Sequence, residues 1–124
     1  MNRKGPERII HIKECIENIL KSTKDVSKES FEEDIVLQAA ITRWIEIIGE
    51  AAKHIPDDII VSHPGIPWKE MAGMRDIIVH DYDDVNNDEI WNVVKKDIPK
   101  LKEQIRKFRR NIHDQALSSV DANS

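Results

Sequence analysis

The sequence has few of the features that stabilise secreted proteins or carry a chain into a membrane. Among its 124 residues there is one cysteine, Cys15, and there are four glycines. A lone cysteine excludes an internal disulfide and is typical of a reducing compartment, so we expect a cytoplasmic protein. No apolar run approaches the roughly 20 residues that cross a bilayer, and no signal-peptide core follows the polar residues 1–6. The sequence therefore predicts no contact with a membrane.

Patterns for metal ions and cofactors are also missing. An EF-hand frame that begins at Asp84 fails, because its sixth position is Glu89 instead of glycine. The histidines at positions 11, 54, 63 and 113 lack the H-x-x-x-H spacing of zinc sites, and there is no glycine-rich phosphate loop. We expect no metal and no cofactor, and we expect Cys15 to be a small buried hydrophobic residue.

Charge is distributed unevenly along the chain. The formal net charge is −4. Residues 95–110 hold eight basic and two acidic side chains, a balance of +6, so the remainder of the chain carries −10. A basic segment of this kind is most often a solvated helix face, although it could guide RNA. The acidic remainder could dock a partner protein.

Apolar positions recur at helical spacing and no stretch alternates like a strand, so we expect an all-α, up-and-down bundle of four to five helices. Ser30 and Glu33 form a capping-box pattern that should open the longest helix, which should end at Ile55-Pro56. The prolines between residues 56 and 67 predict a loop with a short helical turn at residues 57–62. The main helices are expected at residues 7–21, 30–55, 68–80 and 86–112, with a kink at Pro99 in the last.

The longest expected helix is apolar on two of its sides. Such a helix should lie centrally, with one side against the bundle and the other against a second copy of the chain. Gly49 within it would let a neighbouring backbone approach closely. Residues 1–112 are then expected to form one helical domain, followed by a disordered C-terminal tail at residues 113–124.

The densest chemistry lies in residues 75–82, with the sequence RDIIVHDY. Arg75 is a permanent cation whose planar fork of donors matches phosphate oxygens. His80 titrates near neutral pH, so the two residues together could bind a phosphodiester and move a proton at it. Asp76 lies four residues before His80, and on a helix it could accept a hydrogen bond from the imidazole and fix its tautomer.

Arg75 and His80 are five residues apart, which separates them by about 140° on an ideal helix. Either the helix is distorted near His80, or both residues line a cleft that two copies of the chain share. A two-fold homodimer would gather two arginines and two histidines and so supply a separate acid and base.

This segment, which follows Pro67-Trp68 and Gly73-Met74, resembles the motif of the HEPN superfamily and within it most closely that of the HepT-type toxins. The likeness extends to residues 43–52, RWIEIIGEAA, which resemble the second helix of that family. It also includes residues 90–101, which resemble the last helix, and it covers about residues 7–110. The resemblance implies a HEPN-like helical bundle.

The resemblance further implies a metal-independent endoribonuclease that acts as a homodimer on RNA. Arg75 and His80 would be the catalytic pair, with Asp76 as the polar residue beside the arginine. The implied partner is a minimal nucleotidyltransferase, an antitoxin that transfers AMP from ATP to the tyrosine at position 82. AMP on Tyr82 would place bulk and negative charge where RNA must sit, and so silence the enzyme.

Other interpretations use the same residues differently. Arg75 and Asp76 could form surface ion pairs, His80 could interact with the negative end of its helix, and Tyr82 could pack against the domain. A second possible function is a catalytically inactive helical binding module that partners a nucleotidyltransferase, which the acidic remainder would suit. A third is a nucleotide-binding helical protein.

Overall fold

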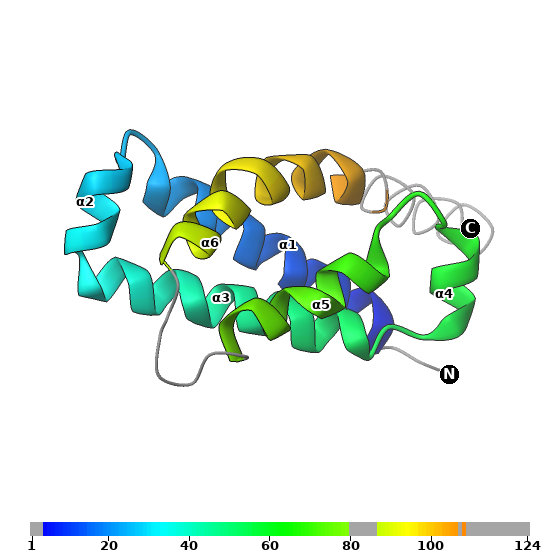
Figure 1. The fold of residues 1–124 in the computed structure, drawn as a ribbon. Helices are drawn as coiled ribbons and strands as arrows, with labels where there is room; N and C mark the ends of the chain where they lie inside the picture. Colours follow the sequence, from blue (N-terminus) through cyan, green and yellow to red (C-terminus); the bar gives the residue numbers. More distant parts are fainter. Residues whose placement is uncertain (1–3, 80–86, 107, 109–124) are drawn as a thin grey trace.

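The computed structural model describes residues 4–79, 87–106 and 108. The expected all-α bundle is confirmed, and the described residues form α1 (Lys4–Thr23), α2 (Lys28–Glu33), α3 (Ile35–Lys53), α4 (Asp57–Ser62), α5 (Trp68–Val79) and α6 (Asn87–Asn92). A π-helical turn, η1 (Val93–Asp97), follows α6, and helical backbone continues over residues 98–106. We call residues 87–106 the final helical segment (Figure 1).

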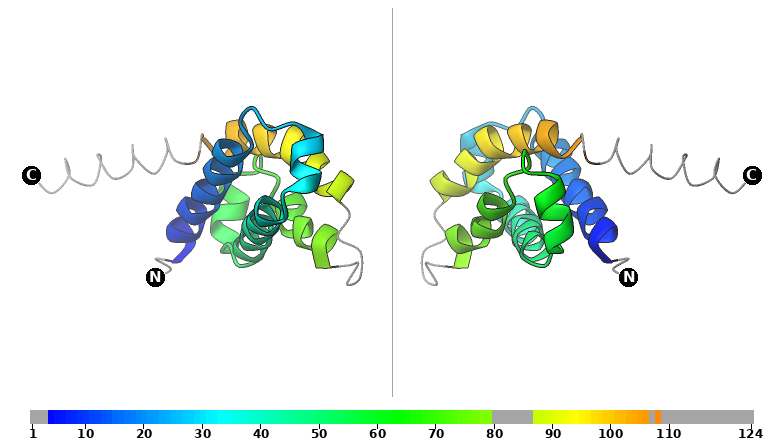
Figure 2. Two further views of the ribbon diagram at one scale, coloured as in Figure 1. Left: turned by 90° about the vertical axis from the view of Figure 1, so that its left-hand side faces the viewer. Right: turned by 90° about the vertical axis from the view of Figure 1, so that its right-hand side faces the viewer.

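The long helix α3 lies at the centre of the bundle. Its most extensive contacts are with α5 and α1. Figure 2 shows α3 between these two helices, with the final helical segment crossing over them. The central position follows from the sequence, because Ile41, Ile45 and Ile48 recur along one side of α3 and are buried.

The N-terminal helix is longer than its apolar stripe predicts, since α1 covers Lys4–Thr23 and the expectation was residues 7–21. The stripe itself forms the buried face of the helix, where Ile9, Ile12, Ile16 and Ile19 are at most 1% exposed. Burial of such side chains contributes about 1.5–3 kcal/mol each, so this face holds α1 against the bundle.

The start of the longest helix differs from the expectation. Ser27, not Ser30, caps α2, and its hydroxyl accepts a hydrogen bond from the Ser30 amide at 3.1 Å. The chain then breaks at Asp34, whose carboxylate accepts from the Leu37 amide at 3.0 Å and caps α3. Aspartate is a strong N-cap, so it outcompetes a continuous helix through this position. The capping-box interpretation of Ser30 and Glu33 is therefore wrong.

Two apolar residues of the first turn of α3 do not join the core. Ile35 is 78% exposed and Val36 is 80% exposed, because the break at Asp34 places them at the edge of the bundle.

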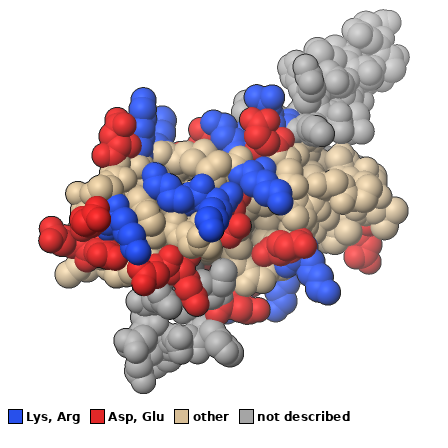
Figure 3. Space-filling model, turned by 45° about the horizontal axis from the view of Figure 1, so that its top comes forward, with Lys and Arg blue, Asp and Glu red and all other residues tan. Residues whose placement is uncertain are grey.

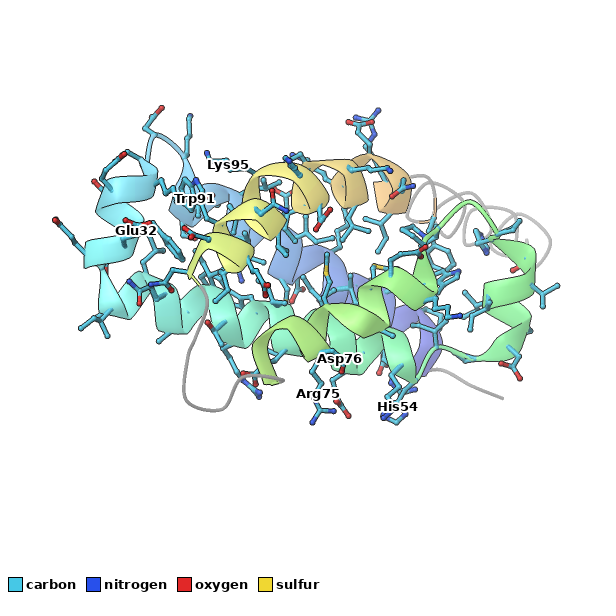
Figure 4. The ribbon with its side chains drawn as sticks, in the orientation of Figure 1. Glu32, His54, Arg75, Asp76, Trp91 and Lys95 are labelled. Carbon is cyan, nitrogen blue, oxygen red and sulfur yellow. The ribbon has the colours of Figure 1, made fainter. Side chains whose placement is uncertain are left out.

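Phe31 of α2 is fully buried and stacks on Trp91 of α6, with ring centroids 5.0 Å apart. Lys95 lies over the same indole at 4.8 Å from its centroid (Figure 4).

The connection between α3 and α5 agrees with the expected loop, and its short helical turn is α4, at Asp57–Ser62 as predicted. Trp68 opens α5, is buried, and donates its indole N–H to the His63 carbonyl at 3.1 Å. This contact fixes the start of α5 against the preceding loop.

The final helical segment adjusts to Pro99 through η1. Proline lacks an amide hydrogen and its ring crowds the carbonyl four residues earlier. The backbone responds with one π-helical turn, in which the Ile98 amide donates to the Val93 carbonyl. The apolar stripe of this segment remains buried, including Ile90, Val94, Ile98, Leu101 and Ile105. The expected start of the last helix at residue 86 and the expected tail at residues 113–124 lie outside the described residues.

Candidate functional site

The position of Arg75 is set by a close approach of α3 and α5. A Cβ atom added at Gly49 of α3 would lie 3.0 Å from the Arg75 Cβ, 3.2 Å from its backbone nitrogen and 3.4 Å from the Ala72 carbonyl oxygen. Glycine is the residue that permits this distance, so the prediction for Gly49 is confirmed. The contact fixes the backbone from which the Arg75 side chain extends.

A carboxylate of α3 holds the other end of that side chain. The Arg75 guanidinium donates through Nη1 to Glu50 Oε2 at 2.7 Å, a short, charge-assisted hydrogen bond between residues 25 positions apart. The second carboxylate oxygen, Oε1, lies 3.4 Å from His54 Nε2 one turn further along α3. Glu50 thus lies between an arginine and a histidine.

These residues line a cleft of about 500 Å³ between α1, α3 and α5. In α3 its lining residues recur every three or four positions, which places them on one face of the helix. The α1 side is tied to α3 by Arg8, whose Nη1 donates to the His54 carbonyl at 3.1 Å. The lining residues are Arg8, His11, Arg43, Glu46, Ile47, Glu50, Ala51, His54 and Arg75.

The cleft presents more cationic than anionic side chains, since three arginines face two glutamates, and two histidines also line it. Arg43 has Glu46 as a distant partner, at 3.6 Å, and its side chain is 70% exposed. The Arg75 side chain is 44% exposed although it is paired. An anionic ligand can therefore reach both arginines from solvent.

Of the four predicted site residues, the structure describes Arg75 and Asp76. Arg75 and Asp76 lie near the end of α5 and are exposed, and Figure 4 shows Arg75 beside His54 at the lower edge of the bundle. Within the part of the chain that the structure describes, Asp76 has no hydrogen-bond or ion-pair partner. His80 and Tyr82 lie outside that part, so their relation to Arg75 remains a prediction.

The described part of the basic segment, residues 95–106, lies on another face of the molecule. Figure 3 shows lysine and arginine side chains gathered over the face of the final helical segment, and Figure 4 places Lys95 at the edge opposite Arg75. Lys102 pairs with Glu17 at 3.3 Å, and Arg106 pairs with Glu103 at 3.6 Å. These cations therefore belong to a solvated helix face and do not line the cleft.

Cys15 is a core residue, as expected, with 2% of its surface exposed. Burial, with a smaller contribution from the negative charge of Glu14, raises the pKa of its thiol to about 11. Such a thiol stays protonated at neutral pH and does not act as a nucleophile.

Among residues 4–79, 87–106 and 108 no group of three or more His, Cys, Asp or Glu side chains could hold a metal ion. No helix in the described ranges is long and apolar enough to cross a membrane.

Most of the cleft was missed by sequence reasoning. Arg43, Glu46, Glu50 and His54 do follow helical spacing, and that pattern could have marked them as one polar face. Arg8 and His11 join them only because α1 packs along α3, which the sequence does not reveal. The pairing of Glu50 with Arg75 likewise depends on tertiary contact.

Comparisons with known proteins agree with this architecture. Residues 12–108 match the model of a family described as Ribonuclease HepT-like. The chain is 44% identical over 110 residues to a protein of Thermococcus cleftensis named "Probable ribonuclease HepT", covering 89% of this chain and 100% of that protein. It is 42% identical over 98 residues to a protein of Caldanaerobacter subterraneus subsp. tengcongensis with RNase in its name, covering 79% and 88% of the two chains.

A solved structure shares the fold as well. It is described as "Crystal structure of the toxin-antitoxin with AMP-PNP", and one of its chains superposes with a TM-score of 0.62. The two chains are 26% identical, and the match covers 88% of this chain and 98% of the other. The helical architecture described above is therefore that of a protein found in a toxin-antitoxin structure.

Proposed function

Because this chain belongs to the HepT-like ribonuclease family, we propose that it is a metal-independent endoribonuclease toxin whose catalytic residues are Arg75, His80 and Asp76. The observation that carries the proposal is the placement of Arg75. Its guanidinium lies in a solvent-open cleft that three arginines and two glutamates line, with one nitrogen held by Glu50 and the other N–H donors available to a ligand.

The chemistry follows from RNA itself, which carries a 2′-hydroxyl that can attack the adjacent phosphate. His80 removes the proton from that hydroxyl, and Arg75 stabilises the negative charge that grows on the phosphate oxygens. A second His80 protonates the leaving 5′-oxygen. The products are a 2′,3′-cyclic phosphate and a free 5′-hydroxyl, and no metal ion takes part.

The cleft suggests how an RNA strand approaches Arg75. Arg43 lies 32 residues before Arg75 in the sequence but lines the same cleft, on the face of α3 that also carries Glu50 and His54. Along α3, Arg43 and His54 are 11 residues apart, or about 16 Å at 1.5 Å per residue. A strand that follows this face can place one phosphate near Arg43 and the next linkages toward Arg75.

The proposed site needs a second copy of the chain. Arg75 and His80 diverge on an ideal helix, so a two-fold homodimer offers the simplest way to bring both residue types to one phosphodiester. Two protomers also supply the two imidazoles that acid and base catalysis require. We expect the protein to be dimeric in solution at the concentrations used for assay.

The proposed partner is a minimal nucleotidyltransferase that acts as the antitoxin. The structural neighbour comes from a toxin-antitoxin structure with AMP-PNP, which supports a nucleotide-dependent partner for this chain. The partner transfers AMP from ATP to the Tyr82 hydroxyl and releases pyrophosphate. The added phosphate repels RNA beside Arg75, so the modified toxin is inactive.

An RNA with one 2′-O-methyl group at the cleavage site tests the mechanism. In EDTA the wild type should cut the unmodified RNA to a 2′,3′-cyclic phosphate and leave the methylated linkage intact, since the nucleophile is blocked. Equal cleavage of both RNAs, or a strict need for a divalent cation, would contradict the proposal. Wild type, Arg75→Ala and His80→Ala are compared on the same substrate, and equal rates in all three would refute the assigned residues.

A second candidate is a catalytically inactive helical module that binds a nucleotidyltransferase. The charge of −10 outside residues 95–110 favours it, because an acidic surface suits a protein partner better than RNA. Expression alone distinguishes the two functions. An active toxin arrests growth, and Arg75→Ala relieves the arrest, whereas an inactive module leaves growth unchanged in both forms.

A further inference from the structure

A carboxylate is unfavourable in a cleft that binds RNA, since it repels the phosphate backbone. Glu50 nevertheless lines the cleft directly beside the arginine that we place at the reacting phosphate. We propose that Glu50 is a positioning residue, which orients the Arg75 guanidinium so that its free donors face the RNA phosphate. This inference rests on the proposed function.

The carboxylate lies between the Arg75 guanidinium, which bonds it, and the His54 ring. Oε2 accepts from Arg75 Nη1 at 2.7 Å, and Oε1 lies 3.4 Å from His54 Nε2. His54 is the C-cap residue of α3, and its carbonyl accepts from Arg8 Nη1 at 3.1 Å. Residues of three helices therefore meet near this carboxylate, because Arg8 belongs to α1, Glu50 to α3 and Arg75 to α5.

The geometry leaves Arg75 able to bind a phosphate. A guanidinium has five N–H donors in one plane, and the bond to Glu50 occupies a single nitrogen, Nη1. The opposite edge, formed by Nη2 and Nε, can still make the paired hydrogen bonds typical of arginine with phosphate. With Glu50 on one edge, the plane and direction of the other edge are set before RNA binds.

The ion pair is poorly explained as a device for stability. The side chains of Arg75 and Glu50 are 44% and 52% exposed, and pairs with this exposure contribute little to folding because water and salt screen them. The backbone of Arg75 is already fixed by its contact with Gly49. What remains free without Glu50 is the long arginine side chain, whose orientation governs catalysis.

The opposite role for Glu50 would be a brake. In that case the carboxylate competes with the RNA phosphate for the arginine, and its removal raises activity. The two roles predict opposite changes in kcat, so kinetic measurements on one substitution separate them.

The experiment measures kcat and KM for RNA cleavage by purified dimers of Glu50→Ala, Glu50→Gln and Glu46→Ala. Glu46 is the matched control, because it lines the same cleft one turn earlier on α3, carries the same charge and pairs with Arg43 instead of Arg75. Thermal unfolding of each variant checks that folding is intact. Arg75→Ala and the double variant that combines Arg75→Ala with Glu50→Ala complete a double-mutant cycle.

Glu50→Ala should lower kcat by about 10-fold to 100-fold, since a misdirected catalytic group loses rate on this scale. Glu50→Gln retains an acceptor oxygen for Nη1 and should recover part of that loss. Glu46→Ala removes a repulsive charge, so it should lower KM without lowering kcat. In the Arg75→Ala background, Glu50→Ala should have no further effect on kcat.

A kcat for Glu50→Ala equal to or above that of the wild type would overturn the positioning role, as would an equal loss of kcat in Glu46→Ala. These results differ from failure of the proposed function. If Arg75→Ala cleaves RNA like the wild type, the catalytic assignment is wrong. If Arg75→Ala is inactive while Glu50→Ala is fully active, only the role of Glu50 is wrong.

Discussion

The contact between Gly49 and Arg75 gives a sharp test of how the helices are packed. In Gly49→Ala the new methyl group would meet the Arg75 Cβ at 3.0 Å, its backbone nitrogen at 3.2 Å and the Ala72 carbonyl oxygen at 3.4 Å. None of these atoms is the flexible end of a side chain. The helices α3 and α5 must therefore move apart by a few tenths of an ångström to admit the methyl group.

Two opposing effects set the magnitude. Overpacking of a close contact costs about 1–3 kcal/mol, whereas replacing a helical glycine by alanine gains about 0.5–1 kcal/mol through the backbone entropy of the unfolded chain. We expect a net loss of about 0.5–2 kcal/mol in the free energy of unfolding. At about 4 °C per kcal/mol for a domain of this size, the Tm should fall by about 2–8 °C.

Gly73 provides the matched control. It also lies inside a helix, α5, and a Cβ atom added there would meet no heavy atom within 4 Å. Gly73→Ala should therefore show the entropic gain alone and raise the unfolding free energy by about 0.5–1 kcal/mol. Urea unfolding followed by circular dichroism measures both variants. If Gly49→Ala is stabilised as much as Gly73→Ala, then α3 and α5 do not approach each other as described.

Three further predictions concern the cleft, the core and the proposed partner. Arg43→Ala should raise KM for RNA without changing kcat. It should also reduce the slope of log KM against log salt concentration by about 0.7, which is the contribution of one phosphate contact on a single strand. An unchanged slope would show that Arg43 does not contact the RNA. The pKa of Cys15 rises from 9.0 to about 11 on folding, so at pH 8 its alkylation by iodoacetamide should be about 100-fold slower in native protein than in urea. Because the folded state holds that proton more tightly, the free energy of unfolding should decline as pH rises from 9 toward 11. If the free energy of unfolding of the wild type rises over this range relative to that of Cys15→Ala, the pKa of Cys15 is not raised. Tyr82→Phe should show no adenylyl adduct by mass spectrometry after incubation with the nucleotidyltransferase and ATP, and it should remain toxic when the two proteins are co-expressed; silencing of this variant would place the modification elsewhere.

The helical architecture was largely predictable because apolar spacing is a local property of the sequence. The stripe of α1 and the short turn at Asp57–Ser62 both follow from neighbouring residues. The start of α3 was not, because Ser27, Ser30 and Asp34 are all good caps, and the sequence alone does not show which of them the chain uses.

The site was predictable only in part, for a related reason. Arg75 and Asp76 stand in a short motif that a reader of the sequence can recognise. Glu50 pairs with Arg75 from 25 residues away, and Arg8 reaches the same cleft from α1, so neither role appears before the helices are packed. Side chains that gather through tertiary contact leave no local pattern.

In the proposed function, cleavage of RNA depends on the Arg75 guanidinium. The direct measurement is the single-turnover rate constant for one RNA oligonucleotide in EDTA, with wild type and Arg75→Ala at equal dimer concentration and with equal thermal stability confirmed. Loss of the guanidinium should lower the rate about 100-fold to 1,000-fold, as for other groups that stabilise charge in a transition state. A rate for Arg75→Ala equal to that of the wild type would contradict a catalytic role for Arg75.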